Sequence, residues 1–194
     1  VDRWVQGDYE NYLTPEQKIP EKPLSVPWES CITMGHAWGW VANDHYKSSR
    51  ELVQLLIGIV AKGGNLLLGV GPKGNGEFEP AVYENLAQLG KWLDANGEAI
   101  YETTPVEPFQ VEKIAYTAGD ENTVYALYMP AKDEEELPET LSIQTQLSGR
   151  LSFTLLASGK KLKARKKDNA WDVSIPKSLR SELAKQEAVV IRVR

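Results

Sequence analysis

Carboxylates and flat aromatic rings are concentrated near the start of this chain. Within residues 4–47 the acidic residues include Asp8, Glu10, Glu16, Glu21 and Glu29, and the large rings include Trp4, Tyr12, Trp28, Trp38 and Trp40. Carboxyl groups transfer protons in hydrolysis, and aromatic faces offer flat apolar surfaces for the faces of pyranose sugars. The set fits a sugar-hydrolysing site, although most of these residues, taken one at a time, are better explained as surface acids or buried anchors.

A helix and a buried strand are predicted directly after this stretch. Ser48 lies three residues before Glu51, which is the spacing of a capping box, and apolar residues recur at helical spacing over residues 52–60. Residues 65–70 then form a short continuous apolar run, typical of a strand that is covered on both faces in a parallel sheet.

A second helix is predicted from Pro80, which suits a first helical turn, to the stop signal Asn96-Gly97. Helix, strand and helix in this order indicate βα units of an α/β fold. Residues 4–47 show no convincing helical period, so we expect one long loop there. In a (β/α) barrel such a loop lies on the C-terminal face, where active sites are built, and Glu16 and Glu29 would share that face with the tryptophans.

The second half of the chain changes character after a boundary near Pro105 to Pro108. Short segments of strand-like composition, separated by turn residues, predict a small antiparallel β-sandwich without convincing helices. The expected strands cover residues 109–116, 123–129, 141–147, 151–157, 161–166, 170–175 and 188–193. We therefore expect an α/β part in residues 1–106 and an all-β domain in residues 107–194.

Composition excludes several classes of function. The net charge is −5 with acidic and basic residues interspersed, which argues against a nucleic-acid partner. Cys31 is the single cysteine, and with only His36 and His45 as imidazoles neither an internal disulfide nor a zinc cluster is expected. We predict no metal and no cofactor, and the apolar runs are too short to span a membrane.

The glycines of residues 69–74 match the G-x-G-x-x-G expression of dinucleotide-binding folds. That fingerprint must run directly into a helix whose N-terminus receives the pyrophosphate. Here Pro72 and the Gly74-Asn75-Gly76 sequence predict a turn instead, and the next helix is expected only near Pro80. We therefore interpret these glycines as a tight turn. Cys31 lacks a plausible His/Asn pairing, which makes a cysteine nucleophile improbable.

The order and spacing of several motifs resemble glycoside hydrolase family 29, the retaining α-L-fucosidases. The resemblance covers roughly the first 105 residues and rests on these motifs: Asp2-Arg3-Trp4, Gly7-Asp8-Tyr9, Thr14-Pro15-Glu16, Trp28-Glu29-Ser30-Cys31, Ala37-Trp38-Gly39-Trp40, residues 62–68, Val70-Gly71-Pro72, Gly74-Asn75-Gly76, residues 90–93 and residues 96–101. Two positions depart from the family pattern. The family usually has Asn where this chain has Gly69, and Tyr or Phe where it has Trp40. The β region is consistent with the family's C-terminal sandwich.

The resemblance implies the last βα units of a TIM-like (β/α) barrel and a double displacement by two carboxyls about 5 Å apart. It points to Glu16 as acid/base, with Glu29 as the alternative, and to Arg3, Trp28 and Trp38 as substrate-binding residues. Arg3 could equally form a structural ion pair. The family's nucleophile is an Asp on an earlier barrel strand, in a Trp-x-Asp context, and we expect no segment of this chain to match that strand.

The expected activity is hydrolysis of terminal α-L-fucosyl linkages, with a fucosylated glycan as substrate. The abrupt start at Val1 and the absent nucleophile lead us to expect a missing N-terminal part of the barrel as the partner of this chain. Family resemblance also implies a periplasmic, secreted or lysosomal location. The alternatives are a non-catalytic carbohydrate-binding relative and a structural module that braces the barrel.

Overall fold

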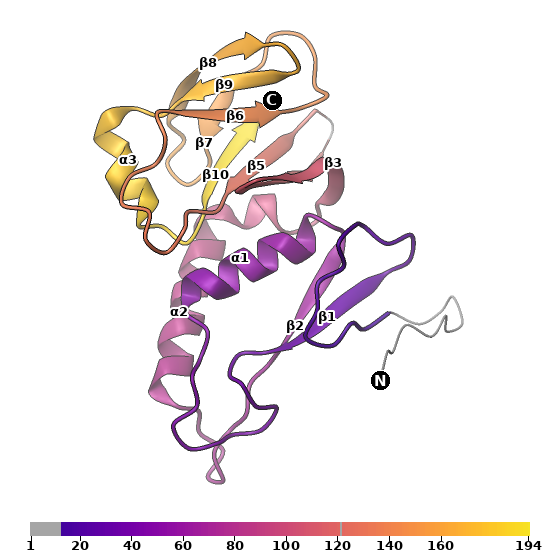
Figure 1. Cartoon of the computed structure of the whole chain (residues 1–194), viewed down its shortest axis with the longest axis vertical. Coiled ribbons are helices and arrows are strands. Elements are labelled where there is room, and N and C mark those ends of the chain that lie inside the picture. Colours follow the sequence, from indigo (N-terminus) through magenta and orange to yellow (C-terminus); the bar gives the residue numbers. More distant parts are fainter. Residues whose placement is uncertain (1–12, 121) are drawn as a thin grey trace. The chain divides into compact units, whose positions relative to one another are not determined.

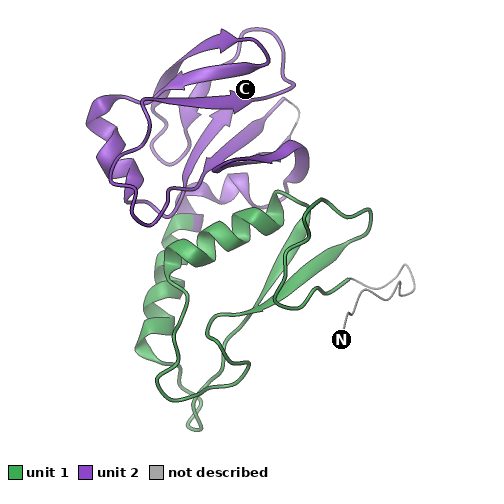
Figure 2. Cartoon of the chain, in the orientation of Figure 1, with its two compact units in different colours: residues 1–92 green, residues 93–194 purple. Residues whose placement is uncertain are grey.

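A computed structural model describes residues 13–120 and 122–194 of the chain. These residues form two compact units, which divide between residues 92 and 93, within helix α2 (Pro80–Asn96) (Figure 2). No helix in the described part of the chain is long and apolar enough to cross a membrane.

The first unit contains a parallel β-α-β arrangement. Strand β1 (Trp28–Thr33) leads to helix α1 (Ser49–Val60) and then to β2 (Gly64–Gly69), which pairs with β1 in parallel (Figure 1). The predicted capping box is confirmed, because the Ser48 hydroxyl accepts from the Glu51 backbone N–H while the Glu51 carboxylate accepts from the Ser48 N–H. The α/β character expected of this region is therefore observed.

The expectation of one unbroken loop over residues 4–47 is wrong for residues 28–33. These residues form β1, and Leu13 and Glu16 make isolated parallel bridges to its Trp28 and Cys31. The sequence Trp-Glu-Ser-Cys-Ile-Thr has no continuous apolar run, because only alternate side chains of β1 face the core. Its pairing partner β2 lies more than thirty residues away, beyond the reach of a local sequence pattern.

Apolar side chains fill two clusters in the first unit. One combines Trp28, Ile32 and Ile59 beneath the strands, and the other combines Met34, Leu52 and Val82 between the helices. Burial of such side chains supplies the main driving force for packing the helices on the strands. The strands are thereby held at fixed positions from which loops and exposed side chains project.

The second unit is an eight-stranded antiparallel sheet with the order β3-β4-β5-β10-β7-β8-β9-β6, folded over a single apolar core into a nearly closed barrel (Figure 1). The strands and the helices of this unit have these bounds: η1 (Gly97–Ala99), β3 (Thr104–Val111), β4 (Ile114–Ala118), β5 (Val124–Tyr128), β6 (Thr140–Gln144), β7 (Phe153–Leu155), β8 (Lys161–Lys167), β9 (Ala170–Ser174), α3 (Lys177–Ala184) and β10 (Val189–Val193).

The antiparallel strands agree with the sequence, but two details differ from the expected sandwich. The sheet is continuous rather than divided into two, because β8 pairs with β7 at its start and with β9 along most of its length. The predicted strand over residues 109–116 is split by a turn into β3 and β4, and Glu112 in that turn has a positive φ of 49°. Helix α3, whose Leu183 is buried, was not predicted.

Candidate functional site

A pocket of about 440 Å³ opens on the parallel strands of the first unit. We call it the Glu16 pocket. It is lined by Thr14, Glu16, Cys31, Trp38 and Leu67. Cys31 and Leu67 are register partners on β1 and β2, and Glu16 bridges to Cys31 from the preceding segment. Three neighbouring parallel segments therefore each contribute a side chain to the same face.

Backbone hydrogen bonds fix Glu16 against β1. The Cys31 N–H donates to the Pro15 carbonyl (3.0 Å), and the Gln17 N–H donates to the Cys31 carbonyl (2.9 Å). Pro15 is buried on one side of this ladder, whereas Glu16 is exposed on the other. Because successive side chains of an extended segment alternate, burial of Pro15 directs the Glu16 carboxyl to the pocket face.

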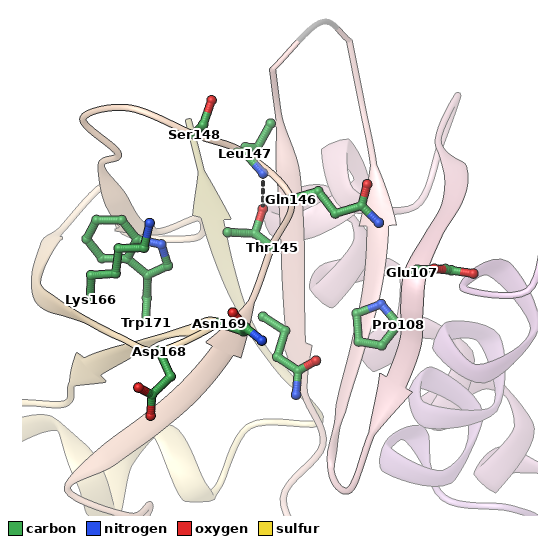
Figure 3. Close-up of a pocket in the computed structure, with 11 residues that line it drawn as sticks. Glu107, Pro108, Thr145, Gln146, Leu147, Ser148, Lys166, Asp168, Asn169 and Trp171 are labelled. Carbon is green, nitrogen blue, oxygen red and sulfur yellow. Dashed lines mark hydrogen bonds between the residues drawn. The ribbon is translucent and has the colours of Figure 1, made fainter.

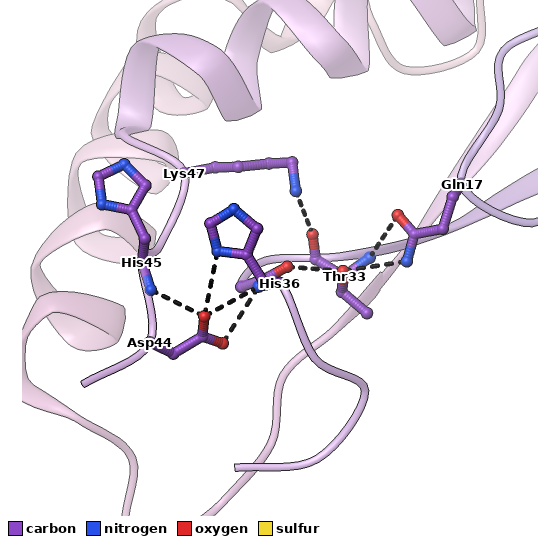
Figure 4. A network of polar contacts seen from close by, with 7 residues as sticks. Gln17, Thr33, His36, Asp44, His45 and Lys47 are labelled. Carbon is purple, nitrogen blue, oxygen red and sulfur yellow. Dashed lines mark hydrogen bonds and ion pairs between the residues drawn. The ribbon is translucent and has the colours of Figure 1, made fainter. Parts of the chain in front are cut away.

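Thr33, the last residue of β1, holds two loops at the carboxyl end of the strand. The Gln17 side-chain amide donates to the Thr33 hydroxyl (3.0 Å), and the Lys47 ammonium donates to the Thr33 carbonyl (2.7 Å) (Figure 4). The segment that carries Glu16 and the end of the loop that carries Trp38 are thus tied to one residue.

Glu29 lies nearer the amino end of β1. It shares the strand face of Cys31 because it is two residues away, but it is not among the residues that line the Glu16 pocket. The rise of a strand places it roughly 6–7 Å further from the carboxyl end than Cys31. The two acidic residues proposed from the sequence therefore occupy different levels of the sheet.

Trp38 is an exposed ring at the carboxyl end of the strands, with 49% of its surface accessible. Its indole lies over Gly69, where a Cβ would meet the ring at 3.5 Å. A side chain at position 69 would therefore touch the indole, whereas glycine leaves the ring lying directly on the strand end.

Asp44 anchors the loop that carries Trp38. Its carboxylate accepts hydrogen bonds from the backbone N–H groups of His36 (3.1 Å) and His45 (2.8 Å) (Figure 4). Burial alone would raise the pKa of Asp44, but these backbone N–H donors hold that pKa below its ordinary value. Asp44 is thus an ionised loop anchor, and Gly35 is required beside it because a Cβ there would stand 2.1 Å from its Oδ2.

A second anchor connects the same loop to the turn after β2. The Trp40 indole N–H donates to Glu79 (2.9 Å), which also forms an ion pair with Lys73 (3.0 Å). These hydrogen bonds, with that of Trp40 contributing most, lower the pKa of Glu79 from its ordinary value. The loop is therefore held before Trp38, at His36, whose N–H donates to Asp44, and after it, at Trp40, which donates to Glu79.

Trp28, which the sequence suggested as a substrate-binding ring, lies in the core of the first unit. Only 1% of its surface is accessible, its ring packs over Gly64, and its indole N–H donates to the Lys62 carbonyl (3.2 Å). Its side chain points away from the face that carries Cys31, since the two are three residues apart in one strand. Arg3 lies outside the described residues.

The glycine-rich segment after β2 forms a turn, as its sequence predicted. The Gly76 N–H donates to the Lys73 carbonyl (2.9 Å), and the Lys73 N–H donates to the Glu77 carbonyl (2.8 Å). Helix α2 begins only at Pro80. The described ranges contain no cluster of His, Cys, Asp and Glu able to hold a metal ion.

Thr14, Cys31 and Leu67 line the pocket, although the sequence, which includes them in family motifs, did not mark them as site residues. Leu67 lies in a run of leucines in which no pattern distinguishes one face from the other. The register between β1 and β2 determines that Cys31 and Leu67 lie side by side on the pocket face, and this register is known only from the paired strands.

Comparison with known proteins shows the family to which the chain is similar. The family model for Alpha-L-fucosidase matches residues 1–98. The tissue alpha-L-fucosidase of Mus musculus is 34% identical over 173 residues, which are 79% of this chain and 38% of that protein. The plasma alpha-L-fucosidase of Homo sapiens is 30% identical over 158 residues, covering 77% of this chain and 32% of that protein. The chain thus spans less than half the length of these relatives.

Solved structures show the same architecture. Alpha-L-fucosidase isoenzyme 1 from Paenibacillus thiaminolyticus superposes with a TM-score of 0.79 at 30% identity, covering 93% of this chain and 44% of that one. The Thermotoga maritima alpha-fucosidase in complex with fucose has a TM-score of 0.77 at 26% identity, covering 95% of this chain and 42% of that one. With half of its residues matched by the family model and its fold shared with solved members, the chain belongs to the α-L-fucosidase family.

Proposed function

We propose that this chain is the C-terminal portion of a retaining exo-α-L-fucosidase that hydrolyses terminal α-L-fucosyl linkages of glycans. Residues 1–106 would be the last βα units of its (β/α)-barrel catalytic domain, and residues 107–194 its C-terminal β domain. The observation that carries the proposal is that Glu16 and the exposed Trp38 line one pocket, toward the carboxyl ends of parallel strands, in a member of the fucosidase family. That end of a barrel is where active sites are built.

Glu16 is the proposed acid/base. In the first step a carboxylate nucleophile attacks the anomeric carbon while the acid protonates the departing glycosidic oxygen. In the second step the same residue, now ionised, takes a proton from the water that releases fucose. The nucleophile would be an Asp in the part of the enzyme that precedes this chain, about 5 Å from the Glu16 carboxyl.

Two further observations support Glu16 over Glu29. Glu16 lines the pocket with Trp38, whereas Glu29 does not. Glu29 also lies roughly 6–7 Å nearer the amino end of its strand than Cys31, the residue that Glu16 bridges. The Glu29 carboxyl, nearer the amino end of the strand, would be suited to supporting the site and not to proton transfer within it.

The aromatic and basic residues have separate proposed roles. Trp38 would pack against an apolar face of the sugar, because its ring is exposed at the pocket. The proposed role of Arg3 is to hydrogen-bond the sugar or to orient a carboxylate. For Trp28 the proposed contribution to binding is indirect, since its buried ring supports β1 and β2 from the core side. Fucose as the sugar is supported by the Thermotoga maritima relative, whose structure is a complex with fucose.

The experiment compares leaving groups in the full-length enzyme that contains this chain. Glu16→Ala should lower the hydrolysis of natural fucosides, whose poor leaving groups need a proton, by about 10²–10⁴-fold. The first step of the hydrolysis of an aryl fucoside with a good leaving group should be slowed far less. Azide should partly restore aryl fucoside turnover and give a fucosyl azide product, because it replaces the base-assisted water.

Glu29→Ala is the matched control, since it removes a carboxyl from the same sheet face. It should change binding or stability without dependence on the leaving group and without azide rescue. Leaving-group dependence and rescue in Glu29→Ala, with neither in Glu16→Ala, would reverse the assignment. Full activity of both variants on natural fucosides would refute an acid/base in this chain, and complete inactivity of the native full-length protein would favour the non-catalytic binding relative.

The chain alone should not turn over substrate. A retaining mechanism cannot begin without its nucleophile. The one Trp-x-Asp string in these 194 residues, Trp92-Leu93-Asp94, lies inside helix α2 and not on a barrel strand, so it does not fit the expected nucleophile. The purified chain should therefore release no more p-nitrophenol from the aryl fucoside than buffer does. Multiple turnovers by the chain alone would show that the nucleophile lies within it.

A further inference from the structure

The second unit contains a pocket of about 450 Å³ at the place where its sheet fails to close. We call it the seam pocket. The two end strands of the sheet order are β3 and β6, and the pocket is lined by Glu107 and Pro108 of β3 and by residues 144–148, which end and follow β6 (Figure 3). The hairpin of β8 and β9 supplies the remaining wall through Lys166, Asp168, Asn169 and Trp171.

Trp171 gives the pocket a rigid apolar surface. Its ring lies 5.3 Å from that of Phe153, centroid to centroid, and packs against the core of the second unit. The residue is only half-buried, so part of the indole borders the pocket. Lys166 is the register partner of Trp171 and stands beside it on the same sheet face. The accessible part of the fixed ring is a surface on which the C–H face of a sugar can stack.

Side-chain amides line the same pocket as this ring. Gln144, Gln146 and Asn169 line the same pocket, and no hydrogen bond among the residues that the structure describes occupies their amide groups. Each amide offers two N–H donors and one carbonyl acceptor. Donors and acceptors paired in this way match adjacent sugar hydroxyls, each of which can also both donate and accept.

The charges of the lining disfavour an anion. Lys166 carries one positive charge, whereas Glu107 and Asp168 carry two negative charges, which gives the pocket a net charge of 1 − 2 = −1. A phosphate or carboxylate ligand would meet net repulsion there. A neutral polar ligand meets no such penalty.

An added peptide strand is also disfavoured at the β3 edge of this seam. The edge strand β3 carries Pro105 and Pro108, neither of which has a backbone N–H to donate. Its pairing with β4 is already interrupted by a bulge between Pro105 and Gln110. An edge without a regular row of donors does not template another strand.

We propose that the seam pocket binds a neutral saccharide, with Trp171 as the stacking surface and the amides of Gln144, Gln146 and Asn169 as its hydrogen-bond partners. The volume lies in the range of pockets that hold small ligands, and mouths of β-barrels are places where such pockets occur. The binding would lie entirely within the second unit and does not depend on the catalytic role proposed for Glu16.

The test is an NMR titration of the ¹⁵N-labelled 194-residue chain with lactose as the neutral probe. We expect saturable shifts of the Trp171 indole N–H and of the Gln144, Gln146 and Asn169 side-chain amides. 3′-Sialyllactose, which adds one negative charge to the same disaccharide, should bind more weakly, and inorganic phosphate should produce no saturable shift of these groups.

Variants separate the seam pocket from other sites. The double variant Gln146→Ala/Asn169→Ala removes two exposed amides without disturbing the core and should weaken lactose binding about tenfold or more. Trp171→Ala should weaken it at least as much, but also removes the Phe153 contact, so its fold must be checked. Ser142→Ala, at an exposed position of β6 outside the pocket, should leave binding unchanged.

Three outcomes would overturn the proposal. They are the absence of saturable shifts with lactose, lactose shifts confined to residues 13–92, and binding that is insensitive to the double amide variant. Tighter binding of phosphate or 3′-sialyllactose than of lactose would also overturn it, because the ligand would then be an anion. Failure of Glu16→Ala to affect fucoside hydrolysis would leave these shifts unaltered, so the two proposals fail independently.

Discussion

Gly71 and Trp40 lie so close that a Cβ on residue 71 would stand 2.3 Å from the Trp40 backbone nitrogen. Gly71 is on the turn after β2, and Trp40 is on the loop that brings Trp38 to the Glu16 pocket. The contact involves backbone atoms on the loop side, so no flexible side chain can move aside. Gly71 therefore sets how closely the loop approaches the strand ends.

Gly71→Ala should displace this loop. A clash with backbone in a packed region costs about 1–3 kcal/mol of unfolding free energy, and urea denaturation of the native and variant chains would measure it. The indole N–H resonances of Trp38 and Trp40 should shift as well. Gly74→Ala is the control, because a Cβ at Gly74 meets nothing within 4 Å. Equal stability and equal indole shifts in the two variants would contradict the role assigned to Gly71.

The Trp40 contact should depend on pH with a defined sign. Glu79 has its pKa lowered in the folded chain, first by the hydrogen bond from Trp40 and then by that from Lys73. A carboxyl with a lowered folded pKa stabilises the fold above its unfolded pKa, and the stabilisation is lost as the pH falls through the folded pKa. The Trp40 indole N–H resonance should therefore stay constant near neutrality and move only in acid, below the ordinary range of Glu.

Glu79→Gln tests this assignment, because glutamine keeps an oxygen acceptor for the indole but cannot ionise. The Trp40 resonance of the variant should remain hydrogen-bonded and should lose its acid titration in ¹H–¹⁵N spectra. An unchanged titration in the variant would mean that another group controls the Trp40 environment.

Gly64→Ala should destabilise the first unit. A Cβ there would stand 2.4 Å from the Trp28 ring, which is fully buried and cannot move without disturbing Ile32 and Ile59. Overpacking of this kind costs about 1–3 kcal/mol. Chemical denaturation followed by tryptophan fluorescence would report the loss.

Gly58→Ala is a matched substitution with the opposite expectation. Gly58 lies inside α1, and its Cβ would make only an ordinary 3.7 Å contact with Ile19. Replacing a helical glycine by alanine stabilises by about 0.5–1 kcal/mol. The explanation fails if both variants move the denaturation midpoint in the same direction.

Tyr125→Phe should lower the unfolding free energy of the second unit. The Tyr125 hydroxyl donates to Glu98 (2.7 Å), whose carboxylate also forms ion pairs with Arg192 and Arg194. Loss of one such hydrogen bond costs about 1 kcal/mol, and the Glu98 carboxylate keeps its arginine partners and partial hydration. Tyr101→Phe, at a residue with 62% of its surface accessible, serves as the control in parallel thermal denaturation.

This hydrogen bond should also respond to acid. The hydrogen bond from Tyr125 is the largest cause of the lowered pKa of Glu98, with Arg192 and Arg194 adding to it. Its stabilisation is present above the unfolded pKa of Glu98 and disappears as the pH falls through the folded value. The stability difference between native chain and Tyr125→Phe should therefore shrink in acid. A difference that grows in acid would contradict this linkage.

Local patterns in the sequence were sufficient for the elements that such patterns specify. The capping box of Ser48 and Glu51 starts α1, the run of residues 65–70 corresponds to β2, and Pro80 starts α2. Each of these signals acts through neighbouring residues, by capping, by a continuous apolar run or by a fixed φ. The apolar run led us to expect a strand covered on both faces, which is wrong for the described residues, because Leu67 of β2 is 49% exposed. The motifs of the first half are also sufficient to identify the fucosidase family.

The remaining features depend on pairing between strands that lie far apart in the chain. No local sequence pattern predicts that pairing. β1 is a strand because β2 and the segment of Glu16 lie beside it, and that register turns Cys31 and Leu67 to the Glu16 pocket while Trp28 turns to the core. In the second unit, the sheet becomes one nearly closed barrel because β8 pairs on both sides. The sequence determined which residues can transfer protons or stack on sugars, whereas tertiary pairing decided which of them share a face, since a strand's side chains alternate and its partner fixes the direction.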